Sequence, residues 1–367
     1  RIEGAPEGIK GVSLFVVPKY MVGEDGSLGE RNACSCGGLE EKMGIHGNAT
    51  CVMNYDGATG FLVGEEHKGM RTMFVMMNEA RLGVGLQGLS QAVVAYQNAV
   101  DFAKDRLQGR SLTGPKAPEK PADPIIVHPD VRRMLMDQKA FLEGARALTY
   151  WTAFQGDLQH KSPDEKVREK AGDYMALLTP VIKAYLTHMG FEKANQALQL
   201  HGGSGFTREW GLEQIVRDCR ITLIYEGTNG IQAMDLVARK MMDGGEAANR
   251  LLDEIEADAE AARDVFPNMT DALWQASETL REATDWLTEQ SNMDTRFAGA
   301  VPYLRAFARG LGAHMHLKAA LADKGGPREK LARFYILRLL PEHVGLLAHA
   351  QAGEADLFAL SADELAA

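Results

Sequence analysis

Apolar residues recur at intervals of three and four over most of residues 70–241, and this helical period limits the possible folds more than any other feature. The pattern covers residues 70–108, 131–154 and 167–200, and a further stretch follows Thr228. Amphipathic helices joined by mostly short connections bury their apolar faces against one another. The sequence therefore predicts four long antiparallel helices in a bundle.

Glycines and prolines set the expected boundaries of these helices. The first is expected to be one long helix, or two with a break near residues 83–85, and to end near Gly109. Pro180 lacks a backbone N–H and is expected to kink or split the third helix. Gly202 is expected to end the helical stretch before it. Residues 113–129 hold five prolines and are predicted to form a loop.

Residues 1–68 are predicted to form β structure instead. Short runs rich in β-branched residues predict strands at residues 12–18, 50–55 and 60–64. Residues 19–40 are rich in glycine and charge and predict a loop or hairpin. Strands this short do not make an independent sheet. Since the chain opens without Met and runs directly into a strand, we expect it to begin within a larger β-domain.

Further helical periods follow a glycine-rich boundary near residues 243–246. They cover residues 251–265, 270–290, 300–322 and 329–350. The expected domains are therefore residues 1–68 for the partial β-domain, 69–243 for the bundle and 244–367 for an appended helical domain. The fold class is mainly α with a partial β-domain.

Charge and cysteine content exclude several classes of function. The net charge of −10 argues against a general nucleic-acid surface. No run approaches 18 apolar residues, so no membrane span is expected. Cys34 and Cys36 are too close for the usual zinc spacing, and no histidine cluster accompanies them, so no metal is predicted. Reduced thiols in a cytoplasmic protein fit the four cysteines better than a disulfide framework.

A candidate catalytic carboxylate lies in residues 224–232. Glu226 stands between Tyr225 and Gly227, directly before the two good N-cap residues Thr228 and Asn229. Apolar neighbours would keep this carboxylate poorly hydrated, which suits a base near neutral pH. The alternative is a glutamate held beside a helix N-terminus by the helix dipole, and the local residues alone favour it.

Two upstream segments change this balance. Gln199-Leu200-His201-Gly202-Gly203-Ser204-Gly205-Phe206 and Arg217-Asp218 precede Ile224-Tyr225-Glu226-Gly227-Thr228. In this order and spacing the three segments resemble the acyl-CoA dehydrogenase family. The resemblance covers about residues 8–243 and extends into the C-terminal helices, as in a longer bacterial branch. It implies a four-helix bundle preceded by part of a β-barrel-like domain, with the family's N-terminal helical domain absent.

The resemblance also implies residue roles. Glu226 would abstract the α-proton of an acyl-CoA. Some branches place the base directly before the arginine that matches Arg81, but Ala80 occupies that position and Glu79 lies one residue away. Substrate contacts are implied for Asn78, Arg81, Tyr225 and Gly227. FAD contacts are implied for Arg106, Gln108, Gln199, Gly202, Gly203, Thr228 and Asn229.

Each of these motifs has a structural alternative. Arg106 offers a phosphate-binding fork, but cations are also favourable at a helix C-terminus. Gly202-Gly203-Ser204-Gly205 lacks the spacing of a dinucleotide-binding loop and resembles a helix C-cap when taken alone. We expect His201 to be packed or capping, and Arg217-Asp218 to form a structural ion pair.

The implied reaction is FAD-dependent α,β-dehydrogenation of a short or medium acyl-CoA, with 3-methylthiopropionyl-CoA among the candidates. The implied partners are an electron-transferring flavoprotein and a second copy in a homodimer. The enzymatic alternatives are an acyl-CoA oxidase and a nitroalkane-oxidising relative, and glutamate rather than aspartate at position 226 disfavours the second. A non-catalytic helical dimerisation module or a DNA-associated relative is the alternative of another class.

Overall fold

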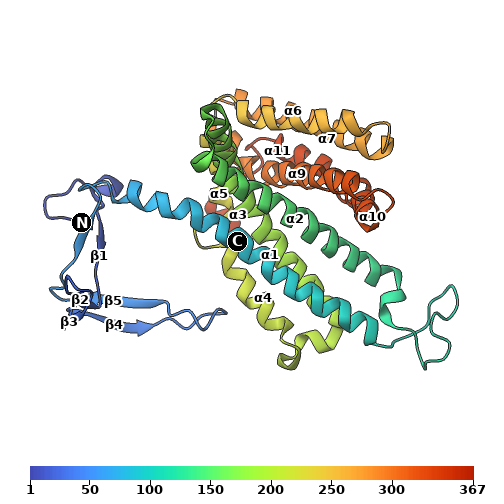
Figure 1. Cartoon of the computed structure of the whole chain (residues 1–367), viewed down its shortest axis with the longest axis horizontal. Helices are drawn as coiled ribbons and strands as arrows, with labels where there is room; N and C mark the ends of the chain where they lie inside the picture. The colour runs from blue at the N-terminus through green and yellow to red at the C-terminus, as the bar shows by residue number, and fades with distance from the viewer. The chain divides into compact units, whose positions relative to one another are not determined.

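The computed structural model describes residues 1–367, which divide into two compact units at residues 1–80 and 81–367. Most residues are helical and strands occur only before residue 64, which confirms the expected class of a mainly α chain with a partial β region (Figure 1). No helix combines the length and apolar character that a membrane crossing requires.

Six short strands form three antiparallel pairs in the first unit: β1 with β6, β2 with β3, and β4 with β5. Their bounds are β1 Leu14–Val16, β2 Tyr20–Val22, β3 Leu28–Arg31, β4 Cys34–Leu39, β5 Cys51–Tyr55 and β6 Phe61–Val63. The three predicted strands correspond to β1, β5 and β6. Residues 19–40 were expected to form a loop or a hairpin, and the β2–β3 hairpin lies there, whereas β4 was missed because two glycines interrupt its apolar pattern.

The first long helix, α1, runs unbroken over Gly69–Asp105 and ends four residues before Gly109. The expected break near residues 83–85 is absent, and two glycines of α1, Gly85 and Gly88, mark a close approach to another helix. A Cβ at Gly88 would lie 2.8 Å from the carbonyl oxygen of Leu186, and one at Gly190 would overlap the carbonyl oxygen of Gly88. Glycine is therefore needed on both helices where α1 crosses α3 (Glu165–His201).

Two further bundle helices, α2 (Pro129–Lys161) and α3, pack along each other. Pro180 was expected to kink or split α3; the helix continues through that residue, so it is not split, and the kink stays a prediction. Gly202 does end α3, with a φ of 58°. The fourth element is also shorter than predicted: α5 spans only Asn229–Ala238, after the unpredicted α4 (Leu212–Arg220).

Seven helices follow in the C-terminal part: α6 Glu246–Ala262, α7 Pro267–Glu289, α8 Met293–Ala298, α9 Ala300–Ala322, α10 Pro327–Phe334, α11 Glu342–Ala350 and α12 Ala362–Ala366. The helix predicted at residues 300–322 matches α9. The one predicted at residues 329–350 is split, because a π-helical turn (Tyr335–Leu339) and Pro341 separate α10 from α11.

The larger of two buried clusters in the second unit includes residues from Leu89 to Ala350. Figure 1 shows α9 between the α6–α7 pair and the bundle helix α2, and α9 contacts all three. Helix α5 also packs on both α3 and α9. The boundary between bundle and appended domain at residue 243 stays a prediction.

Candidate functional site

Glu226 and Gly227 form a left-handed turn between a 3₁₀ turn (Ile221–Leu223) and α5. Their φ angles are 55° and 85°. A non-glycine residue in this region costs about 1–3 kcal/mol and persists only where neighbouring groups hold it. The strained backbone at Glu226 is therefore held by its neighbours, directly before the start of α5.

The carbonyl oxygen of Glu226 is held by two side chains. Arg81 donates from Nε at 3.3 Å, and Gln232 donates from Nε2 at 3.2 Å. Both donors are buried, so these bonds are shielded from water. A Cβ at Gly227 would come within 2.6 Å of the Gln232 amide nitrogen, so this position needs glycine for space as well as for its φ.

A buried lysine on α3 holds the next carbonyl. Lys183 has no exposed surface, and its Nζ donates to the Gly227 oxygen at 2.7 Å and to Asn229 Oδ1 at 3.0 Å. Burial lowers the pKa of Lys183 to about 8. The positive charge of Arg81 acts in the same direction and the Glu226 carboxylate opposes it. Lys183 thus ties α3 to the turn that carries the candidate base.

Thr228 and Asn229 begin α5 in different ways. Thr228 is the N-cap, and its side chain accepts a hydrogen bond from the Ile231 N–H at 3.3 Å, as predicted. The amide group of Asn229 faces α3, where its Nδ2 donates to the Ala184 oxygen at 3.1 Å. The contacts of Asn229 in the chain therefore position α5.

Tyr225 and Ile224 flank the candidate base unequally. The Tyr225 hydroxyl donates to Gln87 Oε1 on α1, and burial raises the pKa of Tyr225. Ile224 leaves 46% of its surface exposed, so it shields the carboxylate less than its apolar character suggests. Glu226 itself is half-buried.

Four of the residues with implied cofactor roles line one pocket of about 230 Å³: Arg106, Gln108, Gly202 and Gly203. One wall of the pocket is formed by the residues just after α1. There the backbone N–H of Gln108 donates to the backbone carbonyl oxygen of Asp123 at 3.0 Å. Asp123 is fully buried and accepts backbone N–H bonds from Ser111, Lys116 and Ala117, which lower its pKa to about 2. This carboxylate holds the proline-rich loop in place.

His201 forms another wall of this pocket and is packed, as predicted. Its ring stacks on Phe102 with centroids 4.3 Å apart, and its Nδ1 lies 2.8 Å from the Ala197 oxygen. Burial lowers the pKa of His201, and its Nε2 is buried without a hydrogen-bond partner.

Three further expectations had different outcomes. Gln199 is exposed on the last turn of α3, and it does not line the pocket that contains Arg106. Asn78 is exposed on α1 within the first unit, so its role stays a prediction. Arg217 pairs with Glu213, which lies four residues earlier on the same face of α4, at 2.7 Å, and its expected pairing with Asp218 stays a prediction.

Sequence reasoning missed Lys183. Its signal was present: a single cation stands among apolar residues from Pro180 to Leu186, with Thr187 one helical turn later on the same face. A lysine in a buried stripe needs a partner, so this pattern could have identified it.

Two family models match the chain. The model described as acyl-CoA dehydrogenase, C-terminal domain, matches residues 67–242, and the model described as acetyl-CoA dehydrogenase C-terminal like matches residues 251–361. Among curated proteins, 3-methylmercaptopropionyl-CoA dehydrogenase of Ruegeria pomeroyi is 41% identical over 342 residues, covering 90% of this chain and 58% of that protein. A butyryl-CoA dehydrogenase of Syntrophomonas wolfei is 34% identical, covering 93% of this chain and 60% of that protein.

Solved structures share the fold at lower identity. Caenorhabditis elegans ACDH-11 in complex with C11-CoA gives a TM-score of 0.76 at 18% identity, covering 90% of this chain and 54% of that one. An acyl-CoA dehydrogenase of Bacillus anthracis complexed with FAD gives 0.65 at 19% identity, covering 87% and 56%. The chain spans about three fifths of the length of the curated relatives above. These matches extend over most of the sequence, and the chain belongs to the acyl-CoA dehydrogenase family.

Proposed function

We propose that the intact protein carries out FAD-dependent α,β-dehydrogenation of an acyl-CoA, with Glu226 as the base that takes the α-proton. The observation that carries this proposal is the left-handed turn at Glu226 and Gly227. Its two carbonyls are held by Arg81, Gln232 and Lys183, which come from three different helices. A base placed this firmly needs little reorganisation when the reaction begins.

The same turn offers a hydrogen-bond donor. Removing a proton next to a thioester builds negative charge on the thioester oxygen, and preorganised donors stabilise that charge. The backbone N–H of Glu226 makes no hydrogen bond within the chain. We assign it as one donor to the thioester oxygen, while the carboxylate of the same residue accepts the α-proton.

The pocket beside Arg106 fits part of FAD. The Arg106 guanidinium has no partner in the chain and suits a pyrophosphate. A Cβ at Gly202 or Gly203 would meet nothing within 4 Å, so a cofactor can approach the backbone there. Gln108, Gln199 and Thr228 complete the proposed contacts. When bound, FAD supplies the acceptor for the β-hydrogen, which leaves as a hydride.

Substitution of the base tests the assignment. Glu226→Gln should keep bound, yellow FAD in the intact protein but lose bleaching by acyl-CoA under anaerobic conditions. We expect kcat to fall by about 10² to 10⁴, the usual contribution of a general base. Glu79→Gln, at an exposed position on α1, is the matched control and should turn over normally. Turnover retained in Glu226→Gln would place the base elsewhere.

The name of one relative supports a proposal for the substrate class. The Ruegeria pomeroyi protein is named for 3-methylmercaptopropionyl-CoA, so we propose a short acyl-CoA of this kind as substrate. An electron-transferring flavoprotein is the proposed electron acceptor, and the proposed assembly is a homodimer. Anaerobic titration with a panel of acyl-CoAs of different chain length identifies the substrate.

A further inference from the structure

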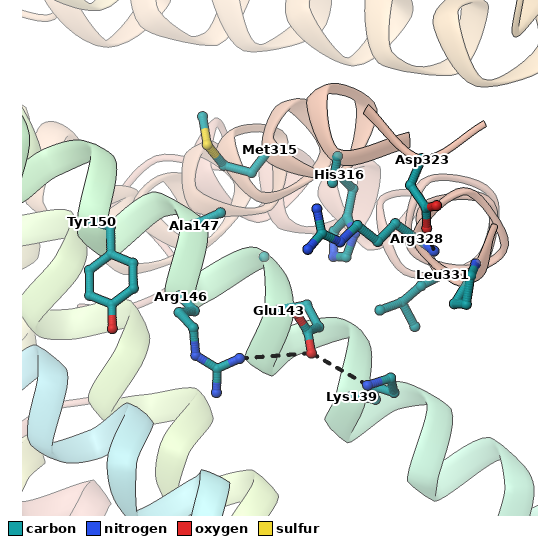
Figure 2. A pocket seen from close by; sticks show the side chains of 13 residues that line it. Lys139, Glu143, Arg146, Ala147, Tyr150, Met315, His316, Asp323, Arg328 and Leu331 are labelled. Carbon is teal, nitrogen blue, oxygen red and sulfur yellow. Dashed lines mark hydrogen bonds and ion pairs between the residues drawn. The ribbon is translucent and has the colours of Figure 1, made fainter. Parts of the chain in front are cut away.

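A second, larger cavity lies between α2, α9 and α10, with a volume of about 490 Å³ (Figure 2). This size is typical of small-molecule sites. The cavity shares no residue with the turn at Glu226 or with the pocket beside Arg106. Neither the proposed reaction nor the proposed cofactor uses it.

A neutral histidine that bridges α2 and α9 forms the cavity floor. His316 is buried on α9, and its Nε2 donates to the Ala140 oxygen of α2 at 2.8 Å. Burial lowers the pKa of His316 to about 4, so the ring is neutral at pH 7. A Cβ at Gly144 would lie 2.9 Å from His316 Nε2, so α2 and α9 approach closely beneath the cavity.

Apolar groups dominate the walls. Ala147 and the ring of Tyr150 come from α2, Met315 and Ala319 from α9, and Leu331 from α10. Tyr150 and Ala147 are exposed, although both lie on a helix whose other faces are packed. Such a wall favours the aliphatic part of a ligand because burial there removes apolar surface from water.

The rim has more positive than negative groups, although the whole chain carries −10. Glu143 is neutralised from both sides, by Lys139 at 3.4 Å and Arg146 at 3.8 Å. Asp323 accepts the backbone N–H of Arg328 at 3.0 Å. The Arg328 guanidinium has no hydrogen bond or ion pair within the chain, and Figure 2 shows its side chain extending over the cavity toward α2.

We propose that this cavity binds a medium-length aliphatic carboxylate as a second, non-catalytic ligand. The carboxylate pairs with Arg328, and the chain lies against Ala147, Met315 and Leu331. An arginine fork matches a carboxylate with two parallel hydrogen bonds. A neutral aliphatic ligand would make the same apolar contacts but would not pair with Arg328. We therefore expect a carboxylate to bind this cavity more tightly than a neutral ligand of the same length.

A methyl probe inside the cavity tests the proposal. The protein is labelled with ¹³C at methionine methyls, the Met315 resonance is assigned with Met315→Leu, and octanoate is titrated in. We expect a saturable shift of this resonance, and 1-octanol should bind at least fivefold more weakly. Arg328→Gln should weaken octanoate binding at least fivefold. Arg333→Gln, on the same helix but outside the lining, should not change it.

Filling the cavity gives an independent check. Ala147→Trp should abolish the octanoate shift while the protein stays folded, because Ala147 is exposed. Three outcomes would overturn the proposal: no saturable shift, equal binding of octanol, or unchanged binding in Arg328→Gln. The Met315 signal does not depend on turnover, so failure here and failure of Glu226 as the base are distinguishable.

Discussion

Lys183 shows how one residue can connect a core helix to the candidate base. A buried ammonium group is costly unless hydrogen bonds compensate for lost water. Here the compensation comes from the Gly227 carbonyl and the Asn229 side chain, at 2.7 and 3.0 Å. These two bonds also hold the turn that contains Glu226. The interactions that make burial of Lys183 tolerable are therefore the same ones that fix the geometry of the site.

This linkage predicts a pH dependence of stability. The pKa of Lys183 is about 8 in the folded chain and 10.5 as the ordinary value, so between these pH values the unfolded chain binds more protons. Stability therefore rises with pH in this window, by up to about 1.4 kcal/mol per pH unit. The penalty for the buried charge is fully present below pH 8.

The measurement is urea unfolding from pH 7.5 to 10. The difference in unfolding free energy between wild type and Lys183→Met should grow in favour of wild type as pH rises. Lys166→Met, exposed on the same helix, is the control and should give a constant difference. A flat difference for Lys183→Met would show that its protonation does not change on folding.

At the scale of elements, the crossing of α1 and α3 decides how the bundle assembles. Gly88 and Gly190 meet there with backbone against backbone. Glycine in a helix costs about 1 kcal/mol relative to alanine, and the close approach compensates for that cost. Gly83 lies on α1 with no neighbouring atom within 4 Å of a Cβ, so it makes no such contact.

Two alanine substitutions are expected to act in opposite directions. Gly190→Ala should destabilise the chain by about 1–3 kcal/mol, because its Cβ would overlap the Gly88 carbonyl and force the helices apart. Gly83→Ala should stabilise it by about 0.5–1 kcal/mol. Thermal and urea unfolding measure both effects, and a neutral or stabilising effect of Gly190→Ala would contradict the close crossing.

At the scale of the whole molecule, the core of the second unit joins the bundle to the C-terminal helices. The larger of its two buried clusters includes residues from Leu89 on α1 to Ala350 on α11. Helix α9 contributes a largely buried surface that contacts α2, α5 and α7. Elements that share a core unfold together.

Single-tryptophan variants test this cooperativity. One variant keeps Trp151 on α2, and another keeps Trp286 on α7, with the other tryptophans changed to phenylalanine. Both reporters should give the same urea midpoint, because the shared core is lost in one step. A lower midpoint for Trp286 would mean that the C-terminal helices unfold separately.

Features that depend on nearby residues could be predicted from the sequence. The bounds of α9, the end of α3 at Gly202 and the N-cap at Thr228 follow from helical period and capping preference. The order and spacing of three short segments, at residues 199–206, 217–218 and 224–228, likewise indicated the family. Glycine in β4 erased the local pattern, so that strand was missed.

Only the tertiary structure decided what distant segments do to one another. Lys183 meets Gly227 across 44 residues of chain, and Pro180 is tolerated inside an unbroken α3. Gly85 proved to be a contact point between helices, where the local pattern allowed a break near residues 83–85. The physical reason is that helical period and capping act within a few residues, whereas packing, burial of charge and cavity shape depend on which surfaces meet after folding.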